Sequence, residues 1–352
     1  MTGPGPDILG GNVARSAGLR PASSAAGGRN RGSAGWRAGR ERRRVLAVAA
    51  SRPARAAPPH RENWRAAHGA SPTRAQRQRD GRFRPMAQDL TEIPVPPALG
   101  PDPIRIRHPQ GAFVPTPASR IALKAVAAHA ARFRGRGLDW GSGSGLLAIA
   151  AARLAGVEEV LGLELDPRGV AAARENARRN GAADKVRFIE SDAYDPVSEE
   201  GRRALAGFEG STDFLIANPP SSSPVGDGFA MRRVVVRGAV RYLRPGGLLL
   251  LSVSSQYGEE RVAELLGEAP GFRHDGVGAS TDLVPFDMRR PDLRRDVETY
   301  AREEERGGLT YAFRNPRNPE TPMTAIEAWT HFHATGKSPL SRWQSHLLVW
   351  GG

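Results

Sequence analysis

From Pro115 to the C-terminus, short apolar runs alternate with segments that carry apolar residues at helical spacing. Such an alternation predicts strand–helix–strand units, which join parallel strands by right-handed crossovers and place helices on both faces of the sheet. The sequence therefore predicts a doubly wound α/β fold with a mostly parallel, seven-stranded sheet. The first five expected strands are Gly137–Trp140, Val160–Leu165, Val186–Ser191, Asp213–Ala217 and Leu248–Val253. The expected helices are Ser119–Arg132, Leu146–Leu154, Pro167–Arg179, Glu199–Leu205, Arg232–Leu243 and Glu259–Leu266.

Composition excludes several classes of protein. The chain of 352 residues has no cysteine, which excludes thiol nucleophiles, iron–sulfur clusters and cysteine zinc sites. No apolar run approaches the roughly 20 residues of a membrane helix, so we expect no membrane partner. The net charge is +14, but residues 1–85 hold 18 arginines and only four acids. The remaining residues carry equal numbers of basic and acidic side chains, so the overall charge says nothing about what the folded part binds.

Residues 1–85 are rich in Gly, Ala, Pro, Ser and Arg. A segment of this composition buries too little apolar surface to offset its chain entropy, so we expect a disordered extension. Three origins remain open. It is a basic arm for RNA or another polyanion, an organelle transit peptide, or the product of a start codon assigned too early, with Met86 opening the ordered part. The expected location is the cytoplasm, or an organelle if the segment is a transit peptide.

A glycine-rich turn follows the first expected strand. Asp139 precedes three glycines, Gly141, Gly143 and Gly145, and a helix begins at once. Glycines let the backbone bend tightly and let a ligand approach the main chain. A dinucleotide-binding loop would need its third glycine one residue later, where Leu146 stands. Since Asp139 would also repel a pyrophosphate, the turn favours a ligand that carries an ammonium or sulfonium group.

Acidic residues end the next two expected strands. Glu164 lies 19 residues after the last glycine of the turn, where a carboxylate can accept hydrogen bonds from both hydroxyls of a ribose. Asp192 ends the third strand and can accept from an adenine amino group. Asp166 is expected to cap the helix that opens at Pro167. Together with the glycine turn, these acids predict a nucleoside ligand.

The fourth expected strand runs into Asn218-Pro219-Pro220. An amide or exocyclic amine is a poor nucleophile because its lone pair is delocalised. The Asn218 side-chain oxygen and a backbone carbonyl, held by two prolines that fix φ, can accept both of its N–H groups and hold the nitrogen at attack distance. The motif therefore predicts an acceptor with a planar nitrogen. The alternative is a Pro-Pro turn in which Asn218 satisfies local backbone.

Taken together, these residues resemble a class I S-adenosylmethionine-dependent methyltransferase. The stretch from Leu161 to Gly181 is similar to the branch that contains ribosomal protein L11, release-factor glutamine and small-subunit rRNA guanine methyltransferases. The resemblance implies S-adenosyl-L-methionine as cofactor, with Asp139 and the glycine loop near its methionine moiety and Asn218 at the acceptor nitrogen. It also implies a capping segment over the cofactor, which makes Phe113 and Thr116 candidate contacts. The implied domains are a linker and capping segment, 86–118, and a methyltransferase domain, 119–352.

One departure from this family bears on the acceptor. An aromatic residue commonly follows Asn-Pro-Pro and stacks on a flat acceptor, but Ser221-Ser222-Ser223 stands here. A flipped base would lose a stacking surface worth ~1–3 kcal/mol. We therefore expect a protein acceptor of ribosomal or translation-associated type, with an RNA or DNA base as the alternative. A non-catalytic methyltransferase-like binding subunit and a nicotinamide-dependent oxidoreductase are the other classes considered.

The last part of the chain is longer than such a fold requires. Two antiparallel strands should close the sheet, and Thr281–Phe286 and His346–Trp350 are the expected segments. Between them, residues 287–344 form an expected insertion, which is a lid, a substrate-recognition element or a surface decoration. It should hold the helices Pro291–Glu305 and Ala325–Thr335, the second opened by the capping box of Thr324 and Glu327. His331 and His333 point to different helix faces, so we assign no metal ligands.

Overall fold

The computed structural model describes residues 90–109, 116–220 and 227–352. The chain divides into two units, Met1–Ala57 and Pro58–Gly352, and every described residue belongs to the second. The expectations for residues 1–85, Phe113 and Ser221–Ser223 lie outside the described residues.

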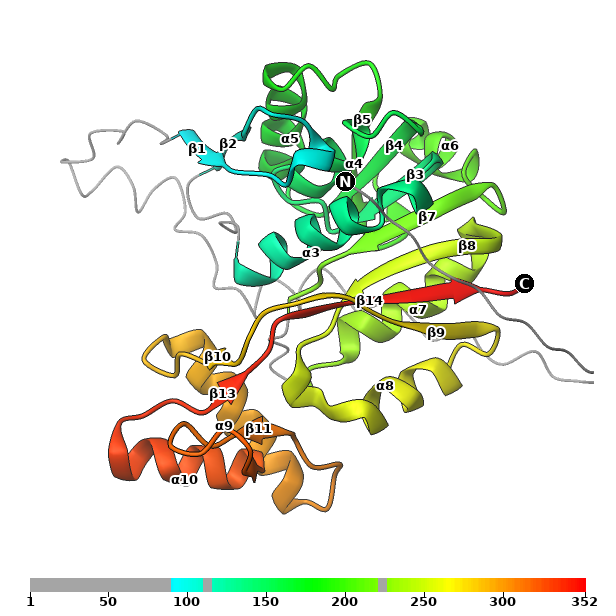
Figure 1. Ribbon diagram of the computed structural model, residues 1–352. Coiled ribbons are helices and arrows are strands. Elements are labelled where there is room, and N and C mark those ends of the chain that lie inside the picture. The colour runs from blue at the N-terminus through cyan, green and yellow to red at the C-terminus, as the bar shows by residue number, and fades with distance from the viewer. Residues whose placement is uncertain (1–89, 110–115, 221–226) are drawn as a thin grey trace, which may run out of the picture. The chain divides into compact units, whose positions relative to one another are not determined.

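An eight-stranded sheet forms the centre of this unit, in the order β6-β5-β4-β3-β7-β8-β14-β9 (Figure 1). Strands β5, β4, β3, β7 and β8 are mutually parallel, and β14 runs antiparallel to both β8 and β9. The strand bounds are β3 Gly135–Trp140, β4 Val157–Glu164, β5 Val186–Asp192, β6 Asp195–Pro196, β7 Thr212–Ala217, β8 Leu243–Ser252, β9 Phe272–Ser280 and β14 Gln344–Trp350. The doubly wound α/β prediction is confirmed. The eighth strand, β6, is a two-residue addition that pairs with the end of β5.

The strand order reverses at β3. From there the chain winds outward through β4 and β5, and then returns to the other side of β3 to form β7 and β8. In open α/β sheets, ligands bind beyond the carboxyl ends of the strands at such a reversal. The ends of β3, β4 and β7 are therefore the place where this fold positions a site.

Helices cover both faces of the sheet (Figure 1). Helices α3, α4 and α5 share one hydrophobic cluster with the sheet, and α6, α7 and α8 share the other. No helix among the described residues combines the length and the apolarity that a membrane span needs. The helix bounds are α3 Pro117–Ala128, α4 Leu146–Ala152, α5 Pro167–Arg179, α6 Glu199–Ala206, α7 Ala230–Tyr242 and α8 Gly258–Gly267, with single 3-10 turns at Pro97–Leu99, Ala130–Arg132 and Ser255–Tyr257.

The closing strands correct one prediction. The penultimate strand is β9, Phe272–Ser280, and not Thr281–Phe286. Only Val284–Pro285 of the predicted segment is extended, as strand β10 of a different sheet. β9 is the edge strand, and its side chains after Phe272 are exposed or half-buried. It therefore lacks the alternation of apolar and polar residues by which a strand is recognised.

Residues 90–107, expected to be part of a linker, form a two-stranded antiparallel sheet of β1 (Leu90–Ile93) and β2 (Ile104–Arg107). Its apolar side chains, Ile93, Ile104 and Ile106, are buried in the cluster that includes α3, α4 and α5. The small sheet is thus packed onto the domain.

The residues between β9 and β14, which include the predicted insertion 287–344, form two helices and a second small sheet. Helix α9 spans Pro291–Glu305 and α10 spans Ala325–Thr335, both with the predicted bounds, and the capping box of Thr324 and Glu327 is present. Four short strands form a second sheet in the order β10-β13-β11-β12. Their bounds are β10 Val284–Pro285, β11 Phe313–Arg314, β12 Pro322–Met323 and β13 Leu340–Ser341.

Buried contacts join the insertion to the main sheet and its helices. The hydroxyl groups of Tyr257 and Tyr300 lie 2.7 Å apart, and both side chains are fully buried. Arg261 of α8 donates to the backbone oxygens of Leu309 and Thr310, and its guanidinium lies 3.8 Å from the centre of the Tyr311 ring. The insertion and the core therefore share one continuous hydrophobic cluster.

Strand pairing fixes where the insertion leaves the sheet. Gln344, which opens β14, pairs with Ser280, which ends β9, and Ser345 pairs with Ser252, which ends β8. Both ends of the insertion thus lie at the carboxyl edge of the parallel strands, the same edge at which β3, β4 and β7 end.

A buried histidine in β14 makes the stability depend on pH. Burial, with smaller effects from His274 and Arg232, lowers the pKa of His346 to about 4, and its Nδ1 lies 3.0 Å from His274 Nε2. Between pH 6.5 and 4 the unfolded chain binds a proton at His346 that the folded chain does not, so the free energy of unfolding falls as the pH falls. We expect His346→Gln to remove a slope of up to ~1.4 kcal/mol per pH unit in this range.

Urea unfolding at several pH values measures this slope. Buried carboxyl groups titrate in the opposite sense, so the quantity compared is the difference between the wild-type protein and His346→Gln. His333→Gln, which changes an exposed histidine of α10, is the control. Parallel pH profiles for wild type and His346→Gln would contradict the assignment.

Candidate functional site

Apart from Thr116, the predicted site residues that the structure describes lie at the carboxyl ends of four strands. Asp139 lies in the last two residues of β3, and the glycine loop 141–145 follows this strand. Glu164 ends β4, Asp192 ends β5, and Asn218 follows β7. Parallel strands β5, β4, β3 and β7 are direct neighbours in that order, so their ends line one edge of the sheet. The ends of these four strands therefore lie side by side, and the residues that they carry share one edge of the sheet.

The glycine loop is held by the two acids beside it. Glu164 accepts hydrogen bonds from the backbone N–H groups of Gly143 and Asp166, both at 2.8 Å. Asp139 is 1% exposed and accepts from the N–H of Ala148 in α4 at 3.0 Å. Asp166 caps α5 by accepting from the N–H of Arg168, as predicted.

The three glycines of the loop differ in the space that surrounds them. All have positive φ, at 67°, 53° and 87° for Gly141, Gly143 and Gly145. A Cβ atom on Gly141 or Gly143 would meet nothing within 4 Å, so open space adjoins the main chain there. A Cβ on Gly145 would lie 2.8 Å from the ring of Phe188. Gly145 therefore serves close packing as the start of α4, and only the first two glycines leave room for a ligand.

Burial raises the pKa of both acids. Burial, with a smaller effect from the nearby Glu164, raises the pKa of Asp139 to about 8, against the effect of the Ala148 hydrogen bond. Burial also raises the pKa of Glu164, although the N–H groups of Asp166 and Gly143 oppose this. Two carboxyl groups with raised pKa at one loop favour a ligand that brings positive charge or hydrogen-bond donors.

The chain turns sharply after Asp192. Ala193 has φ 55°, and it is the one non-glycine residue with positive φ among those described. This conformation costs an L-residue roughly 1 kcal/mol, and Ser191 supports it by donating its hydroxyl to the Ala193 carbonyl at 2.9 Å. Such backbone strain concentrates at functional sites. The sequence carries no signal for it.

Asn218 is oriented by the first helix. Its Nδ2 donates to Ser119 Oγ at 3.1 Å, so its Oδ1 faces away from that hydroxyl. Ser119 and Thr116 form the capping box at the start of α3. The Thr116 side chain, a predicted cofactor contact, therefore lies at the cap that positions Asn218. Pro219 is buried and Pro220 half-buried.

Unpartnered polar atoms gather at the same edge of the sheet. Among the described residues, five buried side-chain polar atoms have no hydrogen-bond partner. Three of them, His108 Nε2, Trp140 Nε1 and Ser142 Oγ, belong to the glycine loop or to residues next to it. Buried polar groups without partners are rare because each costs about 1–3 kcal/mol. Their concentration here is what a ligand-binding site requires.

Sequence reasoning missed three residues of this region: Ser119, His108 and Asn176. Ser119 and His108 act through contacts with distant segments, so local sequence gave no signal. Asn176 of α5 and Asn180, which caps the C-terminus of this helix, stand four residues apart, and this spacing was a usable signal.

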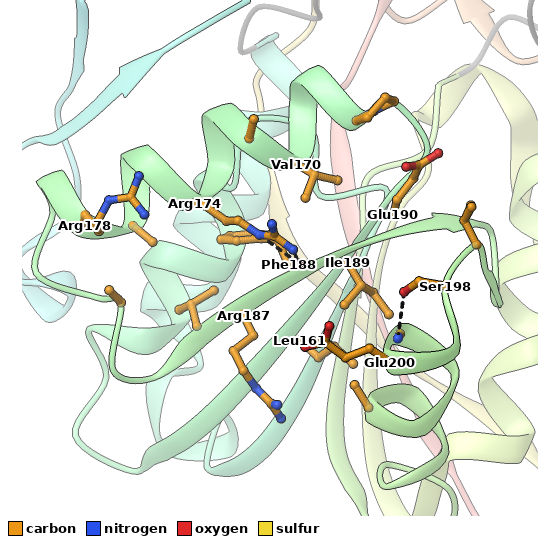
Figure 2. A pocket seen from close by; sticks show the side chains of 18 residues that line it. Leu161, Val170, Arg174, Arg178, Arg187, Phe188, Ile189, Glu190, Ser198 and Glu200 are labelled. Carbon is orange, nitrogen blue, oxygen red and sulfur yellow. Dashed lines mark hydrogen bonds between the residues drawn. The ribbon is translucent and has the colours of Figure 1, made fainter.

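A separate groove of about 560 Å³ lies between α5, β5 and α6 (Figure 2). Arg174 crosses it and donates two hydrogen bonds to the backbone oxygen of Phe188. The groove shares no residue with the predicted site. In the described parts of the chain, no cluster of three or more His, Asp or Glu residues suits a metal ion.

Comparison with known proteins agrees with this geometry. Residues 115–272 match the family model of the methyltransferase small domain. Ribosomal protein L11 methyltransferase of Dechloromonas aromatica is 41% identical over 115 residues, which are 33% of this chain and 31% of that protein. 4-Amino-L-phenylalanine/4-methylamino-L-phenylalanine methyltransferase of Streptomyces pristinaespiralis is 33% identical over 173 residues, 41% of this chain and 54% of that protein. Release factor glutamine methyltransferase of Cereibacter sphaeroides is 30% identical over 161 residues, 40% of this chain and 53% of that protein.

Among solved structures, the 16S rRNA N2 G1207 methyltransferase of T. thermophilus, in complex with AdoMet and guanosine, is 26% identical with a TM-score of 0.41. The alignment covers 53% of this chain and 47% of that chain. The chain spans between a third and about half of the length of the curated relatives named above. The matched segment contains every described site residue identified from the sequence, so the part of the chain that carries the candidate site, residues 115–272, is similar to the methyltransferase small domain.

Proposed function

We propose that the protein is an S-adenosylmethionine-dependent methyltransferase that acts on a planar nitrogen of a protein side chain. The observation that carries the proposal is the meeting of the glycine loop, Glu164, Asp192 and Asn218 at one edge of the sheet. The match to the methyltransferase small domain supports the reaction class.

The residues present suit this cofactor. S-adenosylmethionine supplies an electrophilic methyl group on a sulfonium. The open backbone at Gly141 and Gly143 leaves room for its amino-acid end, and the buried carboxyl groups of Asp139 and Glu164 favour its positive charge and ribose hydroxyls. The unpartnered Ser142 Oγ provides a further polar contact.

Asn218 is the proposed group at the acceptor. Because its Nδ2 is committed to Ser119, its Oδ1 is the atom that can accept an N–H of the acceptor nitrogen. Holding that nitrogen with its lone pair aimed at the methyl group lowers the barrier by orientation and by stabilising developing charge.

Two observations favour a protein acceptor. The chain outside residues 1–85 has no net charge, whereas long nucleic acids are bound largely through phosphate contacts. Two of the relatives named above are methyltransferases of a ribosomal protein and of a release factor. An RNA base is the second candidate, favoured by the similarity to the 16S rRNA enzyme.

Methyl transfer to cell components tests the proposal. The purified protein is incubated with tritiated S-adenosylmethionine and a lysate of cells that lack the protein, and label is counted separately in protein, RNA, DNA and small-molecule fractions. Label in the protein fraction supports the proposal, and label confined to RNA replaces it with the second candidate. Absence of any transfer, together with no heat on titration with the cofactor, would leave a non-catalytic domain.

Asp139 makes cofactor affinity depend on pH. Its pKa of about 8 means that the carboxyl group of the ligand-free protein holds a proton at neutral pH. A positively charged ligand favours the carboxylate, so binding releases this proton, and the dissociation constant falls as the pH rises toward 8. We expect titration calorimetry between pH 6 and 8 to show a change of up to about tenfold per pH unit that Asp139→Asn abolishes. An unchanged slope in Asp139→Asn would assign the effect to another group.

A further inference from the structure

Two asparagines fasten the β1–β2 sheet to helix α5. The side-chain amide of Asn180 pairs with the backbone of Arg105, accepting at 2.9 Å and donating at 2.8 Å. Asn176 pairs in the same way with the backbone of Arg107, at 2.9 Å in both directions. Each amide thus substitutes for a neighbouring strand along the edge of β2.

Asn176 also ties this sheet to the glycine loop. Its Nδ2 donates to the backbone oxygen of Ser144 at 3.0 Å, and the side chain is fully buried. The end of β2 is therefore fixed beside the loop on which the proposed cofactor site is built.

His108 follows β2 directly and contacts the same loop. Its Nδ1 lies 2.9 Å from Ser144 Oγ. Its Nε2 is buried and has no hydrogen-bond partner in the described ranges. Burial lowers the pKa of His108, so the ring is neutral at pH 7 in the ligand-free protein. When the Ser144 hydroxyl donates a hydrogen bond to Nδ1, the single proton of the neutral ring resides on Nε2. Nε2 is then a hydrogen-bond donor without an acceptor.

The chemistry of the neighbouring groups indicates what that donor binds. Asp139 and Glu164 hold the other flanks of the loop, and carboxyl groups suit the ammonium, sulfonium and hydroxyl groups of the cofactor. Neither Asp139 nor Glu164 suits the negatively charged carboxylate at the amino-acid end of the cofactor. The binding of that group requires a donor, and the His108 imidazole supplies one next to the loop.

We propose that His108 is a cofactor-binding residue whose Nε2 donates a hydrogen bond to the carboxylate of S-adenosylmethionine. The inference rests on the proposed function. It makes the β1–β2 sheet part of the cofactor site, beyond the bounds of the matched methyltransferase segment.

Calorimetric titration with two ligands tests this role. One ligand is S-adenosylmethionine and the other is its decarboxylated form, which keeps the sulfonium, the amine and the nucleoside. We expect His108→Ala to weaken S-adenosylmethionine binding at least ~10-fold, the scale of a lost hydrogen bond to a charged group, and to change binding of the decarboxylated ligand less than about twofold. His108→Gln keeps an N–H donor and restores part of the affinity. His333→Ala, on the surface of α10, is the matched control and should bind both ligands as the wild type does.

The outcomes separate this inference from the proposed function. An equal loss for both ligands would show that His108 only holds the loop, and no loss for either would show that it does not act at the site. Either result overturns the inference and leaves the methyltransferase proposal standing. A wild-type protein that binds neither ligand overturns both. If His108→Ala does not fold, the same comparison between the two ligands is made with His108→Phe, which keeps a flat ring but has no N–H donor.

Discussion

Asn218→Ala is expected to lower methyl transfer by about 10²–10³-fold, the scale of losing one group that stabilises developing charge, while S-adenosylmethionine binds with nearly unchanged affinity. The reason is the position of the side chain. It follows β7, across β3 from the β4 end where Glu164 lies, and its described hydrogen bond goes to Ser119 and not to the glycine loop. Tritium transfer to the labelled fraction measures the first quantity, and calorimetry measures the second.

A matched variant separates orientation from chemistry. Ser119→Ala keeps the Asn218 amide but removes the hydroxyl that holds its Nδ2. We expect a smaller loss of turnover, because the amide remains and loses only its fixed orientation. Retained turnover in Asn218→Ala would show that the acceptor nitrogen is held by another group. A loss of cofactor affinity in Asn218→Ala would place Asn218 in the cofactor site instead.

Glu164→Ala is expected to weaken S-adenosylmethionine binding by about 10–100-fold, the effect of deleting a charged hydrogen-bond partner. Two effects add. The variant removes the proposed acceptor of the ribose hydroxyls, and it frees the backbone N–H groups of Gly143 and Asp166 that shape the loop. Calorimetric titration gives the dissociation constant.

Glu158→Ala provides the control, because this exposed residue lies near the start of the same strand, at the end opposite to Glu164. Its affinity for S-adenosylmethionine should equal that of the wild type. Glu164→Gln keeps an acceptor oxygen, so its affinity should lie between those of Glu164→Ala and the wild type. Equal affinity of Glu164→Ala and wild type would remove Glu164 from the proposed ribose site.

Elements with strong local signals were predictable from sequence. Helices α9 and α10 have the predicted bounds because a proline opens the first, and a capping box and a left-handed glycine bound the second. Strands β4, β7 and β8 carry apolar runs because helices cover both faces of the parallel sheet. The acid that ends β4 was recognisable for the same reason, since Glu164 follows such a run directly.

What the sequence did not reveal depends on contacts between distant segments. The edge strand β9 contains Gly276 and Gly278 and is half exposed, so it has little apolar patterning. The β1–β2 sheet is held by amides 69 and 75 residues away along the chain. The bonds that orient Asn218 and His108 likewise span long sequence separations, and no local pattern encodes them.

The pairing of Ser280 with Gln344 has a consequence for how such a chain can evolve. Topologically, residues 281–343 are the loop of a hairpin, so their number can grow or shrink without shifting the register of β9 and β14. Removal would not be neutral, because buried Tyr257 and Arg261 of the core would lose their hydrogen-bond partners Tyr300, Leu309 and Thr310. Length changes within this segment are therefore tolerated by the sheet register, whereas its complete loss would leave buried polar groups of the core without partners.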